Sequence, residues 1–465
     1  MSIDATTPGS PGWWLRRLGM RLEHDRARFD RLEAYARGNH PLPLGNEKMR
    51  TTYRRFQRMA RANFTGLVAE SVRERLQVTG FSTGGGGDAG ADAQAWATWQ
   101  ANHMDADSGL VHQAAVEMSR AYVMVGADTA GGTARALITG EDPRQVVHES
   151  DPQTRRRVRA ALKLWADDVD GGRRAVLYLP DGVVYFTGPK DGRFAESGAA
   201  GWELDTAEGD DGVADPVLPG LVPVVPFVNR PSLSGDLPGG GLGEFEDVID
   251  IQDRINITLL DRMIISAMQA YRQRWAIGVT IDPKDPPFEP GADLLWHVPA
   301  ADARFGDFQE ADLRQVLDAA KEDIRQLAAI TRTPPHYLVG ELNNVNGETL
   351  KATETGLVAK CSARKLHFGE SWEQVNRLAA LVEGRQVAED AEVIWADSES
   401  RSVAELADAA VKKQAAGVPW RQLMVDLGYS PQEIERMEAE RAADALIAGL
   451  ALPPTPPAEQ QPAVA

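Results

Sequence analysis

Cysteine is nearly absent from this chain of 465 residues, and so are long uninterrupted apolar runs. The single Cys361 excludes an internal disulfide and any zinc site built from several cysteines. It lies in a helical apolar pattern, so we interpret it as a packing residue rather than a nucleophile. The most apolar stretch, residues 243–275, is interrupted by charges such as Asp253 and Asp261, which makes it too polar to cross a bilayer.

Catalytic signatures are missing as well. The 8 histidines are scattered without an HExxH pair, and neither a Gly-x-Ser-x-Gly elbow nor a P-loop occurs. The glycine-rich run 239–243 resembles a phosphate-binding loop, but Glu244 and Glu246 follow it and would repel a phosphate. We interpret this run as a turn that leads into a helix. We therefore expect no enzyme activity and no cofactor or metal.

One weak metal motif needs separate treatment. The run Asp168-Val-Asp170-Gly171 resembles a calcium loop, but Leu179 stands where a closing glutamate would be needed. A hairpin turn between two strands is the favoured interpretation. The alternative is an enzyme whose metal site is formed by Asp167, Asp168 and Asp170.

The charge balance is strongly acidic, with a formal net charge of −18 at pH 7. This argues against a protein that holds nucleic acid tightly, because such affinity comes largely from Lys and Arg that neutralise phosphates. Residues 50–61 are a basic exception, with Tyr53 and Phe56 between the arginines. We interpret this run as a solvated helix face, with DNA contact as the alternative.

The dominant positive feature is the stretch 243–275, which contains no Pro and no Gly after its first residue. It predicts one continuous helix of roughly 45–50 Å, at about 1.5 Å per residue. Apolar positions cover most of its circumference, so the helix must pack among other helices. Its acidic start and its basic end, at Arg272 and Arg274, suit the helix dipole.

Periodicity elsewhere predicts an α+β, mostly helical protein. The other helices are expected at 13–37, 47–75, 92–102, 107–123, 312–331, 348–381, 404–415, 421–427 and 431–448. Short strands are expected at 133–139, 145–149, 159–166, 174–179 and 183–187, with strand-like pieces at 276–281 and 294–298. Residues 222–228 contain Pro223 and Pro226, which predicts an edge strand or an extended segment.

Several motifs, taken in order, resemble one protein family. They are Tyr35-Ala-Arg-Gly38, Ala121-Tyr-Val-Met-Val-Gly126, Val222-Pro-Val-Val-Pro-Phe227, Thr333-Pro-Pro335, Gly347-Glu-Thr-Leu-Lys351 and Gly417-Val-Pro419. In these motifs the chain resembles the portal (head–tail connector) proteins of tailed bacteriophages with long non-contractile tails. The resemblance spans roughly residues 25 to 440.

This resemblance implies a homo-oligomeric ring, usually a dodecamer, at a unique capsid vertex of the virion. Double-stranded DNA would be packaged through the ring by the terminase large subunit and later ejected. The other implied partners are a head–tail adaptor protein, the major capsid protein and a scaffolding protein, with no membrane. Synthesis would take place in the host bacterial cytoplasm. The alternative is another structural virion protein, such as a minor capsid or scaffold-like component.

The resemblance also implies a division of the chain. It assigns a wing of helices and a small sheet to 1–240, a first stem helix to 241–275, a small α/β clip to 276–310 and a second stem helix to 311–332. A channel loop and long wing helix follow at 333–399, then a helical crown at 400–450. Independently of the resemblance, the Pro- and Ala-rich composition of 451–465 predicts a disordered tail. The implied channel-facing residues are Glu341, Asn343, Asn344 and Asn346, and the implied clip docking surface is Asp282, Lys284, Asp285, Phe288 and Glu289. The loop has no Lys or Arg, so it can touch phosphates without pairing to them.

Overall fold

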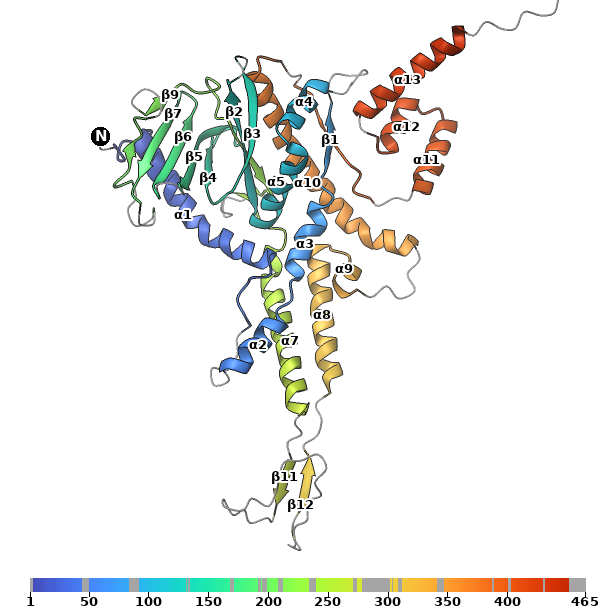
Figure 1. Cartoon of the computed structure of the whole chain (residues 1–465). Coiled ribbons are helices and arrows are strands. Elements are labelled where there is room, and N and C mark those ends of the chain that lie inside the picture. Colours follow the sequence, from blue (N-terminus) through green and yellow to red (C-terminus); the bar gives the residue numbers. More distant parts are fainter. Residues whose placement is uncertain are drawn as a thin grey trace, which may run out of the picture. The chain divides into compact units, whose positions relative to one another are not determined.

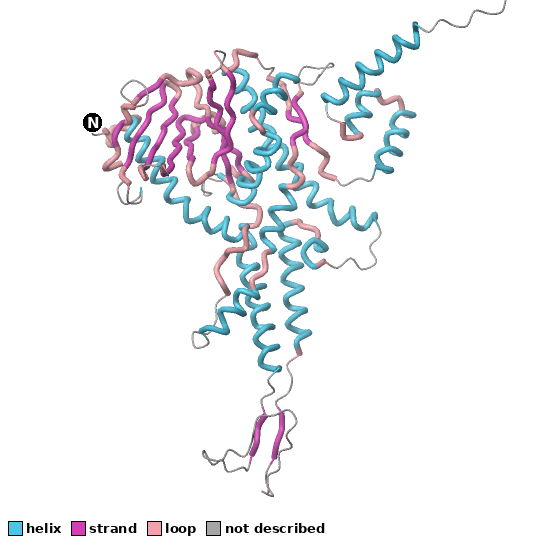
Figure 2. The backbone as a smooth tube through the Cα atoms, viewed as in Figure 1, coloured by secondary structure: helices cyan, strands magenta, loops and turns pink. Residues whose placement is uncertain are grey.

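The protein is seen here in a computed structural model. It describes residues 3–43, 50–82, 92–130, 132, 134–167, 171–190, 194, 199–207, 212–233, 240–270, 274–277, 302, 304–307, 312–340, 347–386, 389–399, 403–429 and 431–450. The chain forms two compact units. The sheet unit comprises Met1–Asp30, Ser71–Gly243 and Val358–Ala465, and the hairpin unit comprises Arg31–Glu70 and Glu244–Leu357. The fold is α+β, mostly helical with small antiparallel sheets, as the sequence predicts (Figures 1 and 2).

The larger sheet of the sheet unit has 6 strands in the order β4-β5-β6-β7-β8, with β9 paired to β7. Its strands are β4 (Val146–Ser150), β5 (Val158–Ala166), β6 (Arg173–Leu179), β7 (Gly182–Gly188), β8 (Glu203–Leu204) and β9 (Val213–Ala214). Helix α1 (Pro11–Ala36) packs Leu15, Leu18 and Leu22 against sheet residues such as Leu162 and Leu177. The expected helix 13–37 and the central strands of this sheet are thus confirmed.

A smaller sheet has 3 strands in the order β10-β2-β3. Its strands are β2 (Arg120–Asp128), β3 (Arg135–Glu141) and β10 (Val224–Val228). The prediction of an edge strand at 222–228 is confirmed, since β10 pairs only with β2 among the described strands. The expected helix 107–123 is wrong at its end, because α5 covers Met104–Met118 and β2 follows. Ser119, at φ 72°, ends the helix in a left-handed conformation, and the β-prone run after it becomes the central strand.

An aromatic core joins the remaining parts of the sheet unit. Helix α4 (Ala93–Ala101) and helix α10 (Gly347–Val382) bring Trp99 and Trp372 together, with ring centroids 4.8 Å apart. Phe227 of β10 lies 4.6 Å from Trp372. The sequence did not predict the two-stranded sheet of β1 (Val78–Phe81) and β13 (Val393–Trp395).

Three helices follow near the C-terminal end, as expected. They are α11 (Val403–Ala415), α12 (Trp420–Asp426) and α13 (Pro431–Leu450). An ion pair of 2.5 Å between Lys413 and Asp426 joins α11 to α12, and the Arg441 guanidinium lies 4.3 Å from the Trp420 ring centroid. The predicted helices 404–415, 421–427 and 431–448 are therefore confirmed to within a few residues.

The hairpin unit is organised around α7 (Ile249–Ala270) and α8 (Leu313–Thr331). It also holds α2 (Arg50–Ala60), most of α3 (Phe64–Arg73) and the short α9 (Pro335–Val339). The expected helix 243–275 is too long at both ends. A 3-10 turn, Glu246–Val248, precedes α7, and β11 (Arg274–Ile277) follows it and pairs with β12 (Arg304–Asp307). Trp275 is therefore a strand residue opposite Gly306.

The single helix expected at 47–75 is also wrong, because α2 and α3 are separate. The break occurs at Asn63, whose side-chain oxygen accepts the backbone N–H of Gly66 at 3.0 Å. This contact caps the start of α3, as Asn commonly does at a helix N-terminus. The periodicity of the sequence is helical on both sides of Asn63, so it cannot reveal the change of direction.

Candidate functional site

The candidate site is the α7–α8 pair of the hairpin unit. The pair is closely packed between the first half of α7 and the last turns of α8, where Ile255, Leu260 and Leu327 are all buried. Arg254 joins the two helices, because its Nη2 lies 2.8 Å from Asp323 Oδ1 and donates to Gln326 Oε1 at 2.8 Å. The predicted helix 312–331 is confirmed, and Asp312 caps it by accepting the backbone N–H of Arg314.

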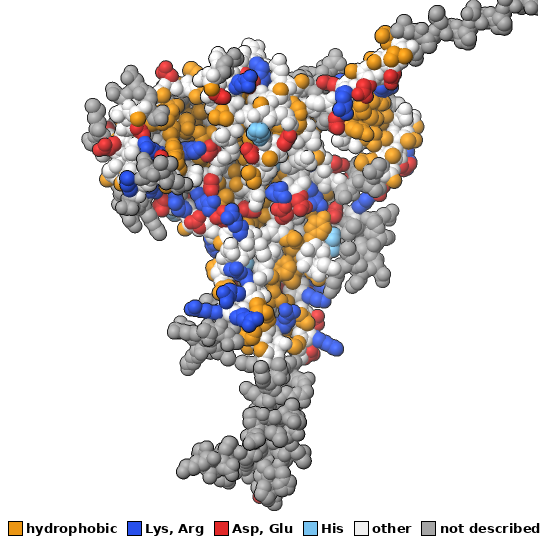
Figure 3. Space-filling view, viewed as in Figure 1, with side chains coloured by type: hydrophobic (Ala, Val, Ile, Leu, Met, Phe, Trp, Pro, Cys, Tyr) orange, Lys and Arg blue, Asp and Glu red, His pale blue; other side chains and the backbone are white. Residues whose placement is uncertain are grey.

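The rest of the pair leaves apolar side chains uncovered. Ile257 of α7 is 41% exposed and Ile330 of α8 is 55% exposed. Beyond Leu260, the apolar residues of α7 and those in the first two turns of α8 are only half-buried: Met263, Ile264, Ile265, Leu313, Val316 and Leu317. Apolar side chains accordingly reach the surface along both helices in Figure 3. Within the part of the chain that the structure describes, much of the apolar surface of this helix pair is therefore left uncovered.

Two buried amides on α7 hold the break between α2 and α3. Gln252 accepts the backbone N–H of Phe64 at 3.0 Å and donates to the carbonyl of Ala62 at 3.1 Å. Asn256, one turn later, accepts the backbone N–H of Ala62 at 2.9 Å and donates to His40 Nε2 at 2.7 Å. These side chains satisfy backbone groups that no helix pairs, which is the usual condition for burying an amide. The helical pattern of 243–275 does not reveal this role, although polar residues four apart inside an otherwise apolar helix, such as Gln252 and Asn256, are a signal for it.

A second polar contact anchors the end of α1 to α7. The Tyr35 hydroxyl donates to the Asp253 carboxylate, 2.8 Å from each of its oxygens, and the Tyr35 ring stacks on His40 at 4.8 Å. Burial and the bond to Asp253 raise the pKa of Tyr35 to about 12. Burial, together with the nearby Arg61, lowers the pKa of His40, so the imidazole is neutral and can accept from Asn256.

The site residues predicted by resemblance lie outside the described residues. They are the channel-loop residues Glu341, Asn343, Asn344 and Asn346, and the clip residues Asp282, Lys284, Asp285, Phe288 and Glu289. The expected strand-like piece at 294–298 lies outside them as well.

The structure describes Asp167 and Cys361, two of the weaker candidates from the sequence. Asp167 lies at the end of the β5–β6 hairpin, where its Oδ2 is 3.8 Å from Arg174, and Asp168 and Asp170 lie outside the described residues. Among the described residues, no group of three or more His, Cys, Asp or Glu is arranged to hold a metal ion. Cys361 is buried, as a packing residue should be.

No helix in the part of the chain that the structure describes has the length and apolarity to span a membrane.

The glycine run before α7 has a packing role. A Cβ on Gly241 would lie 2.6 Å from the carbonyl oxygen of Asn229 and 2.9 Å from that of Ser119. Its own carbonyl accepts from Arg28 at 3.0 Å. This close backbone approach explains a glycine here without any phosphate, in agreement with the interpretation of the run as a turn.

Comparison with known proteins decides the family. The sequence model of the family described as "Phage portal protein, SPP1 Gp6-like" matches residues 18–445. The chain belongs to this family of phage portal proteins. It is 28% identical over 410 residues to the portal protein of Mycobacterium phage D29, covering 83% of this chain and 80% of the relative. It is 29% identical over 447 residues to the portal protein of Mycobacterium phage L5, covering 88% and 87%.

Membership of the portal family confirms the resemblance found in the sequence. Portal proteins are structural components of the bacteriophage virion, and the family implies an oligomeric ring in the capsid. The alternative of a minor capsid or scaffold-like component is not favoured by these matches.

Proposed function

We propose that this portal protein forms a closed ring at one capsid vertex, through which the terminase motor packages double-stranded DNA and through which the genome later leaves. The observation that carries this proposal is the uncovered apolar surface of α7 and α8, with Ile257 at 41% exposed. Apolar surface of this kind needs a partner, and in a ring each copy supplies one on either side. The net charge of −18 supports passage of DNA rather than capture, because few phosphates would be neutralised.

The finer assignment follows the family resemblance. We propose that α7 and α8 are the stem helices beside the channel, and that 276–310 forms the clip, where the terminase and later a head–tail adaptor dock. Residues 1–240 would form most of the wing and 400–450 the crown, facing the capsid and scaffolding proteins. The loop with Asn343, Asn344 and Asn346 would face the DNA.

Electron microscopy of the purified protein tests the ring directly. We expect closed rings with a central hole, and we expect Ile257→Asp to lower the fraction of chains in rings by more than about tenfold, because it places a charge in an apolar contact. Ser266→Asp is the matched control, since Ser266 is exposed on the same helix and is already polar. A wild-type chain that stays monomeric under all assembly conditions would refute the ring.

Deleting residues 343–346 tests the channel loop. We expect rings to assemble normally, because the deletion leaves α8 and α10 intact, while packaged DNA per particle falls sharply. DNA content of purified particles, compared with ring yield from the same variant, is the measurement. Normal packaging by the shortened chain would show that this loop is not the channel-facing element.

A further inference from the structure

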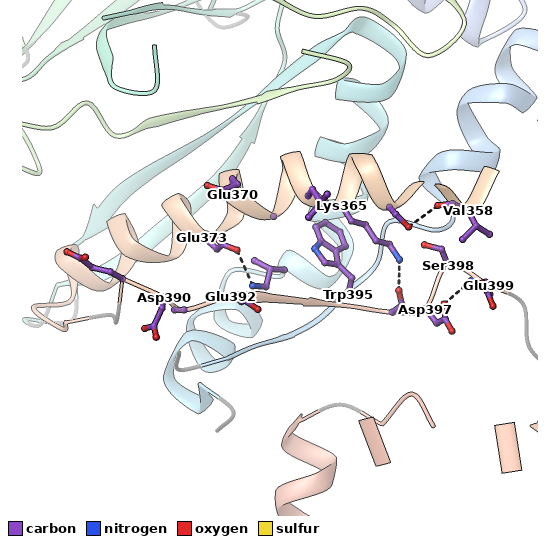
Figure 4. A pocket seen from close by; sticks show the side chains of 17 residues that line it. Val358, Lys365, Glu370, Glu373, Asp390, Glu392, Trp395, Asp397, Ser398 and Glu399 are labelled. Carbon is purple, nitrogen blue, oxygen red and sulfur yellow. Dashed lines mark hydrogen bonds between the residues drawn. The ribbon is translucent and has the colours of Figure 1, made fainter. Parts of the chain in front are cut away.

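A groove of about 780 Å³ opens on the surface of the sheet unit (Figure 4). One wall is α10, from Val358 to Glu373, and the other is the segment 389–399 that contains β13. Apolar side chains form part of its lining, among them Val393 and Trp395. Leu366 on the α10 wall is 74% exposed, which is unusual for a large apolar side chain next to a groove.

The groove is strongly acidic. Among the described residues that line it, Lys365 is the only basic one. The lining carboxylates are Glu370, Glu373, Glu389, Asp390, Glu392, Asp397 and Glu399. Lys365 is occupied, because its Nζ donates to the carbonyl of Ala396. Burial raises the pKa of Glu373 and the charges of Glu370 and Glu392 raise it further, against the lowering effects of the Val393 backbone N–H and of Arg377, which lies 3.8 Å from it. Glu370 and Glu392 therefore repel the Glu373 carboxylate, and a cationic partner in the groove would relieve that repulsion.

The hairpin unit carries a surface of the opposite kind on α2. Arg54, Arg55 and Arg58 are exposed there, and none of them forms an ion pair within the described part of the chain. Met59, 57% exposed, lies beside them. Positions four apart on a helix lie on the same side, so the three arginines and the methionine form one face, which we call the α2 arginine face. Figure 3 shows Lys and Arg side chains gathered over this helix.

We propose that the α2 arginine face of one copy docks into the acidic groove between α10 and β13 of the next copy. The chemistry matches in two respects, since guanidinium groups pair with carboxylates in fixed bidentate geometry and Met59 can cover Leu366. The two surfaces differ from each other, so their contact is heterologous and links copies head to tail, the type of contact from which closed rings are built. The inference rests on the proposed ring and names a contact that holds it together.

Charge complementarity of this kind acts mainly on assembly rate and on register. Opposite fields steer two copies toward one orientation, and the effect weakens as salt screens it. Duplex DNA is the competing partner for the arginines, but it cannot explain the acidic groove. A second copy of the chain accounts for both surfaces at once.

Cysteine crosslinking between two differently labelled chains tests the contact. One chain carries Arg58→Cys and the other Glu370→Cys. Because Cys361 is buried, we expect the wild-type chain not to react with a short bismaleimide. We expect the mixture to give covalent dimers and a chain carrying both substitutions to give a ladder of oligomers. A mixture with Arg16→Cys in place of Arg58→Cys is the control, because Arg16 is exposed on α1 and should crosslink at least about tenfold less.

Charge reversal supplies a second measurement. Arg54→Glu with Arg58→Glu, and separately Glu370→Arg with Glu392→Arg, should each slow ring formation roughly tenfold or more, and combining the four should restore it. Rings that form without the crosslink, for example with α2 facing DNA, would overturn this contact and leave the proposed ring standing. A crosslink only within single chains would overturn it too. Absence of any ring would remove both proposals.

Discussion

Asp25→Asn is expected to lower the free energy of unfolding of the sheet unit by about 3–5 kcal/mol, the cost of leaving a buried charge without its partner. Asp25 of α1 accepts from Nη2 of Arg120 at the start of β2, and their side chains are only 3% and 1% exposed. Asparagine keeps the shape of the side chain but removes its charge. The Arg120 guanidinium would then remain buried without the compensating charge of Asp25, over the Phe29 ring 4.8 Å away.

The cost should be large because Arg120 is already poorly satisfied. Among the described residues, its Nε and Nη1 are buried without a hydrogen-bond partner. Chemical denaturation followed by tryptophan fluorescence measures the change in midpoint. Asp30→Asn is the matched control, since Asp30 lies on the same helix, its side chain is 57% exposed and it lies 3.6 Å from Arg144. An exposed pair of this kind contributes about 0–1 kcal/mol.

The double variant Asp25→Leu with Arg120→Met separates two explanations. If the ion pair matters only because each partner compensates the other, removing both should recover most of the stability lost in Asp25→Asn. If the double variant is as unstable as the single one, the pair has a positive role in fixing α1 over the sheet. A single variant as stable as wild type would show that Arg120 reaches water after all.

The sequence predicted well those elements whose pattern is local. Helix α8 has a capping Asp312 and an amphipathic repeat, and the β5–β6–β7 strands are separated by Asp-Gly turns. Both signals act over a few residues, so a single sequence contains them. Pro226 similarly limited β10 to a sheet edge, where its missing N–H costs no ladder bond.

The errors occurred where distant contacts decide the local structure. The break between α2 and α3 is held by Gln252 and Asn256, nearly two hundred positions further along the chain. Helix α5 ends at its cap Ser119 because the residues after it pair, as β2, with the two neighbouring strands β10 and β3. Trp275 is a strand residue because it pairs within a hairpin whose other strand begins at Arg304. The acidic groove likewise combines α10 with a segment of no regular pattern. Tertiary pairing overrides helical propensity in each of these places.

Acidification from pH 7.5 to pH 5 is expected to destabilise the sheet unit through two buried histidines. Burial lowers the pKa of His112 to about 4 and that of His148 to about 3. Near His148 the charges of Arg120 and Arg21 add to the effect of burial. The unfolded chain binds protons at these residues below about pH 6.5, while the folded chain does not, so stability falls as the pH falls through that window. Each histidine should cost about 2 kcal/mol at pH 5, at 1.36 kcal/mol per pH unit.

The hydrogen bonds of His112 explain why it resists a second proton. Its Nδ1 donates to the carbonyl of Leu76 at 3.0 Å, and its Nε2 accepts the indole N–H of Trp372 at 2.8 Å. A proton on Nε2 would set two donors against each other inside the core. Glu373 acts in the opposite direction, because its raised pKa lets the folded state bind a proton first as the pH falls.

Replacing His148 by Gln isolates one histidine from the rest. The variant should lose about 2 kcal/mol of the destabilisation between pH 7.5 and pH 5, because His148 no longer titrates while an amide can still meet the Tyr122 hydroxyl. His24→Gln, at an exposed position of α1, is the control for the His-to-Gln change itself. Denaturation midpoints of the three proteins across this range give the comparison. An equal pH dependence of the midpoints of wild type and His148→Gln would mean that His148 binds a proton as readily in the folded chain as in the unfolded one. That result would contradict this prediction.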